Sequence, residues 1–270
     1  MQMLSENDVK CLGALATFQY LSPSQMERLG VGKKREYIRQ HTLARLTRGR
    51  SPLVKFQDFG VIAGKGRLER IYFLTEAGAR EAAQIRQCEM SEIRYPKYGL
   101  RYQNNYFHRK AFIDFHIWLV QWIDEHPNAE LEFFNPYFVK DKNRRSINQF
   151  RFKPSDYRSP HDRLTIEPDG VFRFTKDGKP YLCAVEAHRK PDVKAIVKQL
   201  DQHMEAMGAD QNLIAEKFQH QGPIYICSIH DHRRIFESVQ ARLSELSDFK
   251  VFEPHFIFSQ STRLEGINFS

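Results

Sequence analysis

Residues 164–186 read LTIEPDGVFRFTKDGKPYLCAVE, and this stretch decides the fold that we expect for the second half of the chain. Two strand-like runs, 164–174 and 181–186, flank the turn-like segment TKDGK, so the stretch predicts a β-hairpin. Asp169 belongs to a Pro-Asp pair on the first strand, and Glu186 ends the second strand. Because a hairpin places such positions side by side, the two carboxylates are candidates to share one divalent cation.

The segments on either side of this hairpin complete an α/β pattern. Apolar residues at helical spacing predict a helix over 108–123, and alternation predicts a strand over 130–134. After the hairpin we expect a helix from Pro191 through Met207 and a buried strand over 224–229. The order is therefore helix, strand, strand, strand, helix, strand.

The segment 140–162 interrupts this pattern. It is charged, contains prolines and has no apolar period, so we expect a mobile loop. Its basic residues outnumber its acids, which makes the loop a candidate for DNA contact; they include Lys142, Arg144, Arg145, Arg151, Lys153 and Arg158.

The first ninety residues hold most of the positive charge. They carry 15 Lys and Arg against 9 Asp and Glu, which is +6 of the formal +8. Helical spacing predicts one helix ending near Tyr20, a second from Ser22 to about Leu29 with Pro23 at its first position, and a third over 33–48. The outer side of the third helix is basic, which suits phosphate neutralisation; its residues are Lys33, Lys34, Arg35, Arg39, Arg45 and Arg48.

Two strand-like runs, 53–59 and 68–74, follow this helix and flank AGKGR, a glycine-rich basic segment. The pattern predicts a β-hairpin with an exposed tip that carries Lys65 and Arg67, where the glycines permit positive φ. Thr75 is then expected to cap a closing helix.

Composition limits the classes of function. The chain has 270 residues, with 41 Lys and Arg against 33 Asp and Glu, and this excess favours an anionic partner. No apolar run is long enough to span a membrane, so we expect a cytoplasmic protein without a membrane partner. The four cysteines lie too far apart in sequence for a zinc knuckle or a redox motif, so we expect them to be reduced.

Residues 1–90, with three helices, a hairpin and a closing helix, resemble the winged helix-turn-helix domain. The LTEAG segment over 74–78 is similar to an element that is frequent after the second wing strand. The resemblance implies that helix 33–48 enters the major groove of DNA, while Lys65 and Arg67 contact the backbone or the minor groove. The alternative is a solvated basic face that contacts another protein.

Residues 108–230 resemble the PD-(D/E)xK, or restriction-endonuclease-like, nucleases in element order and acids. The resemblance implies that Asp169 and Glu186 bind Mg²⁺ or Mn²⁺ and that a lysine two residues after the second acid is catalytic. Here His188 holds that lysine's position. Three alternatives follow. His188 takes the role of the catalytic lysine, or Lys190 or Lys198 reaches the site instead, or hydrolysis has been lost.

Three further residues are candidates to support such a site. A glutamine is frequent on the helix after the third strand in these nucleases, and Gln199 matches it. Their first helix often lends an acid or a histidine, which here would be Asp114 or His108. A capping role or another satisfied polar role is the alternative for the last two.

The combination of both domains resembles the plasmid replication-relaxation family and the MobC class of conjugative relaxases. It implies a DNA-binding domain over 1–90, a linker over 91–106 and a nuclease domain over 107–270. It also implies metal-dependent nicking of double-stranded DNA at a plasmid transfer origin, with a relaxosome accessory protein and a coupling ATPase as partners. The rival interpretation is a non-catalytic relaxosome accessory protein or replication regulator.

Overall fold

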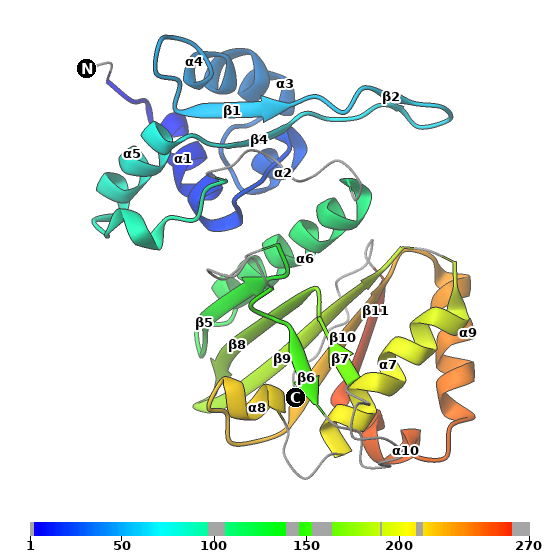
Figure 1. Ribbon diagram of the computed structural model, residues 1–270. Coiled ribbons are helices and arrows are strands. Elements are labelled where there is room, and N and C mark those ends of the chain that lie inside the picture. Colours follow the sequence, from blue (N-terminus) through cyan, green and yellow to red (C-terminus); the bar gives the residue numbers. More distant parts are fainter. Residues whose placement is uncertain are drawn as a thin grey trace. The chain divides into compact units, whose positions relative to one another are not determined.

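The chain is a mixed α and β protein that forms two compact units, Met1–Ile117 (unit 1) and Trp118–Ser270 (unit 2). The computed structural model, drawn in Figure 1, describes residues 3–96, 106–138, 146–152, 164–189, 191–208 and 213–260. Among these residues, no helix combines the length and the apolar character that crossing a membrane requires.

Unit 1 begins with two capped helices, α1 (Glu6–Phe18) and α2 (Pro23–Arg28). The Ser22 hydroxyl accepts a hydrogen bond from the Gln25 backbone N–H, and Pro23 stands at the first helical position. This start of the second helix confirms the prediction, because the N-cap and the proline signal are both local.

The third helix is shorter than predicted and is not α-helical throughout. It consists of α3 (Arg35–Tyr37), a π-helical segment η1 (Ile38–Leu43) and α4 (Ala44–Leu46). Of the four residues that the apolar spacing places on the inner side of this helix, Ile38, Leu43 and Leu46 are buried, whereas Tyr37 is 50% exposed. The basic residues Lys33 and Lys34 precede the helix rather than lying within it.

The predicted hairpin is confirmed. Strand β1 (Val54–Gln57) pairs antiparallel with β4 (Ile71–Leu74), and β2 (Val61–Ile62) pairs with β3 (Gly66–Arg67) in the arm that Figure 1 shows projecting from the helices of this unit. Gly64 has φ +73° and Gly66 has φ +75°, a backbone region that favours glycine. Leu21 adds a further antiparallel bridge, to Tyr72.

Thr75 caps helix α5 (Glu76–Arg86), as predicted, by accepting a hydrogen bond from the Gly78 N–H. A Cβ atom at Gly78 would lie 1.9 Å from the Leu53 carbonyl oxygen. Glycine in the LTEAG segment therefore allows α5 to approach the chain that enters β1. The short helix η2 (Met90–Glu92) follows.

The two units divide inside helix α6 (Tyr106–Glu125), whereas the sequence suggested a linker over 91–106 with the boundary near residue 100. The first part of α6 packs on unit 1, because Asp114 accepts hydrogen bonds from Gln25 (3.0 Å) and from Arg28 (2.7 Å). Residues 97–105 of the expected linker lie outside the described residues.

Unit 2 contains a five-stranded sheet in the order β11-β10-β9-β8-β5. Strands β5, β8 and β9 pair antiparallel, while β9, β10 and β11 pair parallel. The strands are β5 (Ala129–Pro136), β8 (Gly170–Lys176), β9 (Lys179–His188), β10 (Ile224–His230) and β11 (Phe256–Gln260). A separate pair joins β6 (Phe150–Phe152) and β7 (Leu164–Ile166).

Helices α7 (Val193–Gly208) and α9 (Arg233–Ser244) pack on the sheet and on each other (Figure 1). Leu182 and Ala184 of β9 meet Leu200 of α7 in this core. Trp122, at the end of α6, packs edge-on against Phe174 of β8, with ring centroids 5.7 Å apart. The remaining short helices are α8 (Leu213–Lys217), α10 (Phe249–Phe252) and η3 (Glu253–His255).

The central prediction needs one correction. The expected strand over 164–174 is two strands, because β7 ends at Ile166 and β8 begins at Gly170. Pro168, which has no N–H to donate, therefore lies with Asp169 between strands rather than on one. Part of the expected loop over 140–162 forms β6, while 139–145 and 153–163 lie outside the described residues.

Candidate functional site

The two predicted acids lie next to each other in unit 2. Gly170 pairs with Val185 across β8 and β9, so Asp169 comes beside Glu186. The Asp169 Oδ2 atom accepts a hydrogen bond from the Ala187 N–H at 2.8 Å, which holds the carboxylate against β9. We call Asp169 and Glu186 the acid pair.

Glu186 is fully enclosed, with 1% of its surface exposed. Its Oε2 accepts a hydrogen bond from Gln199 Nε2 at 2.6 Å, and its Oε1 lies 2.7 Å from His203 Nε2. Burial raises the pKa of Glu186 well above its ordinary value, and the nearby charge of Asp169 raises it further. The site therefore favours a protonated Glu186 unless a cation compensates its charge.

Helix α7 supplies both of these contacts. Gln199 and His203 are four residues apart, so they project from the same face of the helix. The sequence pointed to Gln199 but not to a role for His203, although the spacing of four was the available signal. Burial lowers the pKa of His203 to about 4, so its ring is neutral at pH 7.

Two more histidines lie beside the acid pair. His188 shares a sheet face with Glu186, because residues two apart on a strand do so. Across the parallel β9–β10 pair, Ser228 aligns with Glu186 and His230 aligns with His188. The rings of His188 and His230 are 4.9 Å apart, and Ser228 Oγ lies 2.9 Å from His230 Nε2.

These residues form one polar cluster, which is buried except for the partly exposed Asp169 and Gln199. Burial lowers the pKa of His230 to about 4, and its ring also contacts Phe236 and Phe258. The acid-histidine cluster consists of Asp169, Glu186, His188, Gln199, His203, Ser228 and His230.

Lys190 and Lys198 were the two lysines expected to replace the catalytic lysine whose position His188 holds. Lys190 lies outside the described residues. Lys198 is exposed, and one helical step turns it about 100° from Gln199. At the end of β9, Arg189 forms a 2.7 Å ion pair with Asp231.

The acid pair offers carboxylate oxygens, which are the ligands that Mg²⁺ or Mn²⁺ prefers. Within the described ranges, no group of three or more His, Cys, Asp and Glu side chains is arranged to hold a metal. A cation here would thus rely on the two carboxylates, with water and phosphate oxygens completing its shell, which is a common arrangement for Mg²⁺. The close approach of two acids, of which one is buried, fits such a cation.

The two candidates from the first helix of this region lie in the part of α6 that belongs to unit 1. Asp114 is bonded to Gln25 and Arg28, and Lys110 lies 3.3 Å from its carboxylate. His108 is half-buried in the first turn of α6, which is also part of unit 1. The structure thus gives Asp114 a packing role in unit 1.

A basic surface in unit 1 holds most of the predicted DNA contacts. Lys33, Lys34, Arg35 and Arg39 are exposed. Arg39 pairs with Glu36 one turn earlier, and Arg35 lies 3.9 Å from Glu69. Arg35 and Arg39 thus present exposed guanidinium groups on the surface of the third helix.

Arg45 has a different environment. It pairs with Asp8 of α1, whose side chain is fully buried, and it also donates a 2.5 Å hydrogen bond to Ser5. A buried carboxylate needs such a partner. The structure therefore gives Arg45 a role in joining two helices, which its sequence position on a basic helix did not indicate.

The hairpin arm carries the other predicted contacts. Lys65 and Arg67 are exposed, with the Lys65 Nζ atom 4.1 Å from the ring centre of Phe107. Arg67 pairs with Asp58 at 2.7 Å. A hydrogen bond from the Gly60 N–H lowers the pKa of Asp58, and Arg67 and Arg70 lower it further, so this carboxylate stays ionised and braces the arm.

Comparisons with protein-family models, curated proteins and solved structures found no match to this chain.

Proposed function

We propose that this protein binds double-stranded DNA through unit 1 as a winged helix and nicks one strand with a divalent metal at the acid pair of unit 2. The observation that carries the nicking proposal is the position of Asp169 beside Glu186 at the β8–β9 junction. The setting we propose is plasmid mobilisation at a transfer origin, with a relaxosome accessory protein and a coupling ATPase as partners.

Unit 1 supports DNA binding by its distribution of charge. The exposed residues Arg35 and Arg39 lie on a helix, and Lys65 and Arg67 lie on a projecting hairpin. A helix in the major groove and a hairpin along the backbone are the contacts that a winged helix makes. Several exposed cations can neutralise phosphates and release counterions.

In unit 2, the hydrogen bonds that orient the acid pair support the proposal of strand scission. Ala187 N–H orients Asp169, while Gln199 and His203 orient Glu186. When bound, Mg²⁺ or Mn²⁺ would polarise the scissile phosphate and lower the pKa of a bound water. His188, on the same face as Glu186, is the candidate to position the water or to move a proton.

A second candidate function rests on the enclosure of Glu186. Both of its oxygens have protein partners, so this carboxyl group is satisfied by hydrogen bonds without a metal. Under this alternative, unit 2 retains a nuclease-like core without hydrolysis. The protein would then be a DNA-binding relaxosome accessory protein or replication regulator.

A nicking assay separates the two. Supercoiled plasmid carrying the cognate transfer origin is incubated with Mg²⁺ or Mn²⁺, and open-circular product is measured. We expect Asp169→Asn and Glu186→Gln each to abolish nicking and to leave DNA affinity within a few-fold, since each removes a ligand charge but keeps its shape. Glu167→Gln, which alters an exposed acid two residues from Asp169, is the matched control and should nick normally. Normal nicking by Glu186→Gln, or none by the wild type, would favour the regulator.

A further inference from the structure

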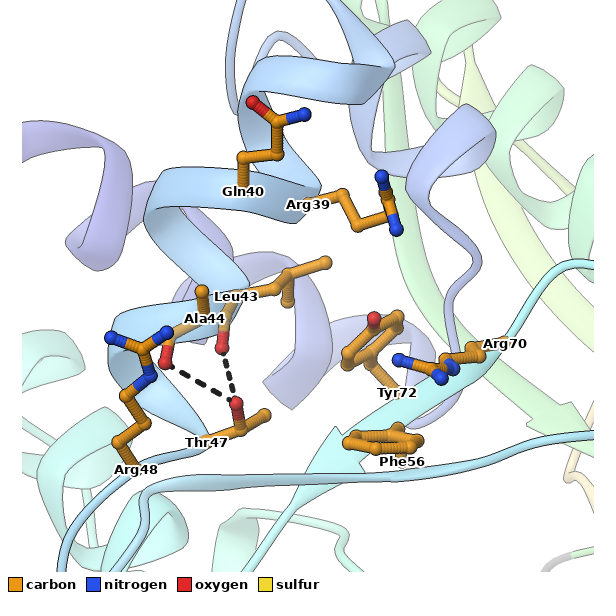
Figure 2. Close-up of a pocket in the computed structure, with 9 residues that line it drawn as sticks. All are labelled: Arg39, Gln40, Leu43, Ala44, Thr47, Arg48, Phe56, Arg70 and Tyr72. Carbon is orange, nitrogen blue, oxygen red and sulfur yellow. Dashed lines mark hydrogen bonds between the residues drawn. The ribbon is translucent and has the colours of Figure 1, made fainter.

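A pocket of about 380 Å³ opens in unit 1 between the third helix and the strands of the hairpin. Figure 2 shows its lining: Arg39, Thr47 and Arg48 come from the helix side, while Phe56, Arg70 and Tyr72 come from the strand side. Pockets of this size accommodate small organic ligands.

The lining is positively charged. It contains three arginines and no acid. Arg39 and Arg70 have carboxylate partners outside the lining, Glu36 and Asp58. Arg48 is exposed and forms no ion pair with any residue in the described part of the chain. The pocket therefore has spare capacity for an anion, with Arg48 as the first candidate.

The strand side of the pocket is aromatic. Phe56 is 42% exposed, an unusual state for a large apolar side chain on a strand. The ring centroids of Phe56 and Tyr72 are 5.6 Å apart. The Arg70 guanidinium carbon lies 4.5 Å from the centroid of the Phe56 ring. Burial raises the pKa of Tyr72, and the charges of Arg70 and Arg39 act in the opposite direction, so both cations lie near its hydroxyl. An exposed ring and a guanidinium plane together form a stacking surface.

A phosphate anion and a planar base are two of the three parts of a nucleotide, the third being the sugar that joins them. We propose that this pocket binds one unpaired nucleotide of a DNA strand, with its base against Phe56 and its phosphate near Arg48 and Arg39. An intact duplex could place a phosphate near the arginines. Its bases could not stack on Phe56, because they are already paired and stacked on each other. Stacking on aromatic side chains is how proteins hold unpaired bases. The proposal rests on the proposed DNA binding and adds the class of DNA structure that is recognised.

The test compares two labelled DNAs in equilibrium titrations, a blunt duplex and the same duplex with a short single-stranded extension. We expect the wild type to bind the extended DNA about tenfold more tightly, because one unpaired base gains a stacking contact that the blunt duplex cannot make. Phe56→Leu should bring this ratio close to one and leave affinity for the blunt duplex unchanged. Phe56→Trp, which keeps a ring, should retain the ratio.

Two arginine variants separate pocket charge from general charge. Arg48→Gln should weaken binding of the extended DNA, whereas Arg80→Gln, which changes an exposed arginine on α5, should not. Thermal unfolding of each variant confirms that it is folded. A full preference for extended DNA in Phe56→Leu would overturn the proposal.

The remaining outcomes are also decisive. Equal affinity of the wild type for both DNAs overturns the pocket proposal and leaves DNA binding intact, while no binding to either DNA overturns both. In a third arm, deoxyadenosine monophosphate is titrated alone and as a competitor. If it binds more tightly than the extended DNA and displaces it, the pocket belongs to a free nucleotide and the proposal for a DNA strand is wrong.

Discussion

Unit 1 exposes the charges of its candidate DNA-binding surface to water, whereas unit 2 buries those of its candidate catalytic site. Arg35 and Arg39 are solvated and pair with acids on the surface. Glu186 and His203 are almost completely buried, and burial shifts the pKa of each. Exposed charges act over distance and are screened by salt, while buried charges depend on individual hydrogen bonds. The two units should therefore respond differently to substitution, salt and pH.

The largest effect is expected at the exposed surface. Arg35→Ala combined with Arg39→Ala should lower DNA affinity roughly tenfold to a hundredfold and reduce the slope of log K against log salt by about 1.8, because two phosphate contacts are lost. Folding should be retained, since both side chains are exposed. Titrations at several salt concentrations measure both quantities. An unchanged slope would remove this helix from the DNA interface.

One arginine on the same helix should contribute to stability although it is itself exposed, because its partner Asp8 is buried. Arg45→Ala should lower the free energy of unfolding by about 1–3 kcal/mol, because buried Asp8 loses its ion-pair partner. Arg48→Ala, three residues later and exposed, should change it by less than about 0.5 kcal/mol. Urea unfolding of both variants provides the comparison. Equal stability of the two would show that the pair with Asp8 contributes nothing.

The buried histidines should make unit 2 sensitive to acid. Burial lowers the pKa of His230 to about 4, from an ordinary value of 6.5. A folded-state pKa below the unfolded one means that the stability is fully present above pH 6.5 and is lost as the pH falls towards 4. Relative to His230→Gln, the wild type should therefore lose about 1–2 kcal/mol between pH 7 and pH 5.

The control for this experiment is His232→Gln, which alters an exposed histidine two residues away. It should follow the pH dependence of the wild type throughout. Urea unfolding at pH 7, 6 and 5 measures all three proteins. If His230→Gln also parallels the wild type, the ring of His230 is not kept neutral by burial.

The smallest effect is expected at the hairpin tip. Lys65→Ala should change the free energy of unfolding by less than about 0.5 kcal/mol, because the side chain is exposed and loses only its contact with the Phe107 ring. Its DNA affinity should fall a few-fold. Thermal unfolding and a DNA titration measure both, and a large loss of stability would mean that the tip is part of the packing of unit 1.

Local signals in the sequence determined many of the elements correctly. Ser22 with Pro23, Thr75 with Gly78, and the two glycines around Lys65 each act on neighbouring residues, so their structures could be predicted. The alternation and apolar runs likewise predicted β9 and β10. The adjacency of Asp169 and Glu186 followed from the hairpin that joins them.

Tertiary structure decided what depends on residues distant in the sequence. Nothing in the sequence distinguishes Arg45 from the neighbouring arginines. Its ion pair with Asp8, 37 positions earlier, depends on how the two helices pack. His203 contacts Glu186 because α7 packs on β9, and the pocket around Phe56 exists because a helix and a hairpin meet. Which residues are charged, apolar or able to cap a helix can be read directly from the sequence. Packing alone decided which charges are buried, and burial sets both their pKa values and their partners.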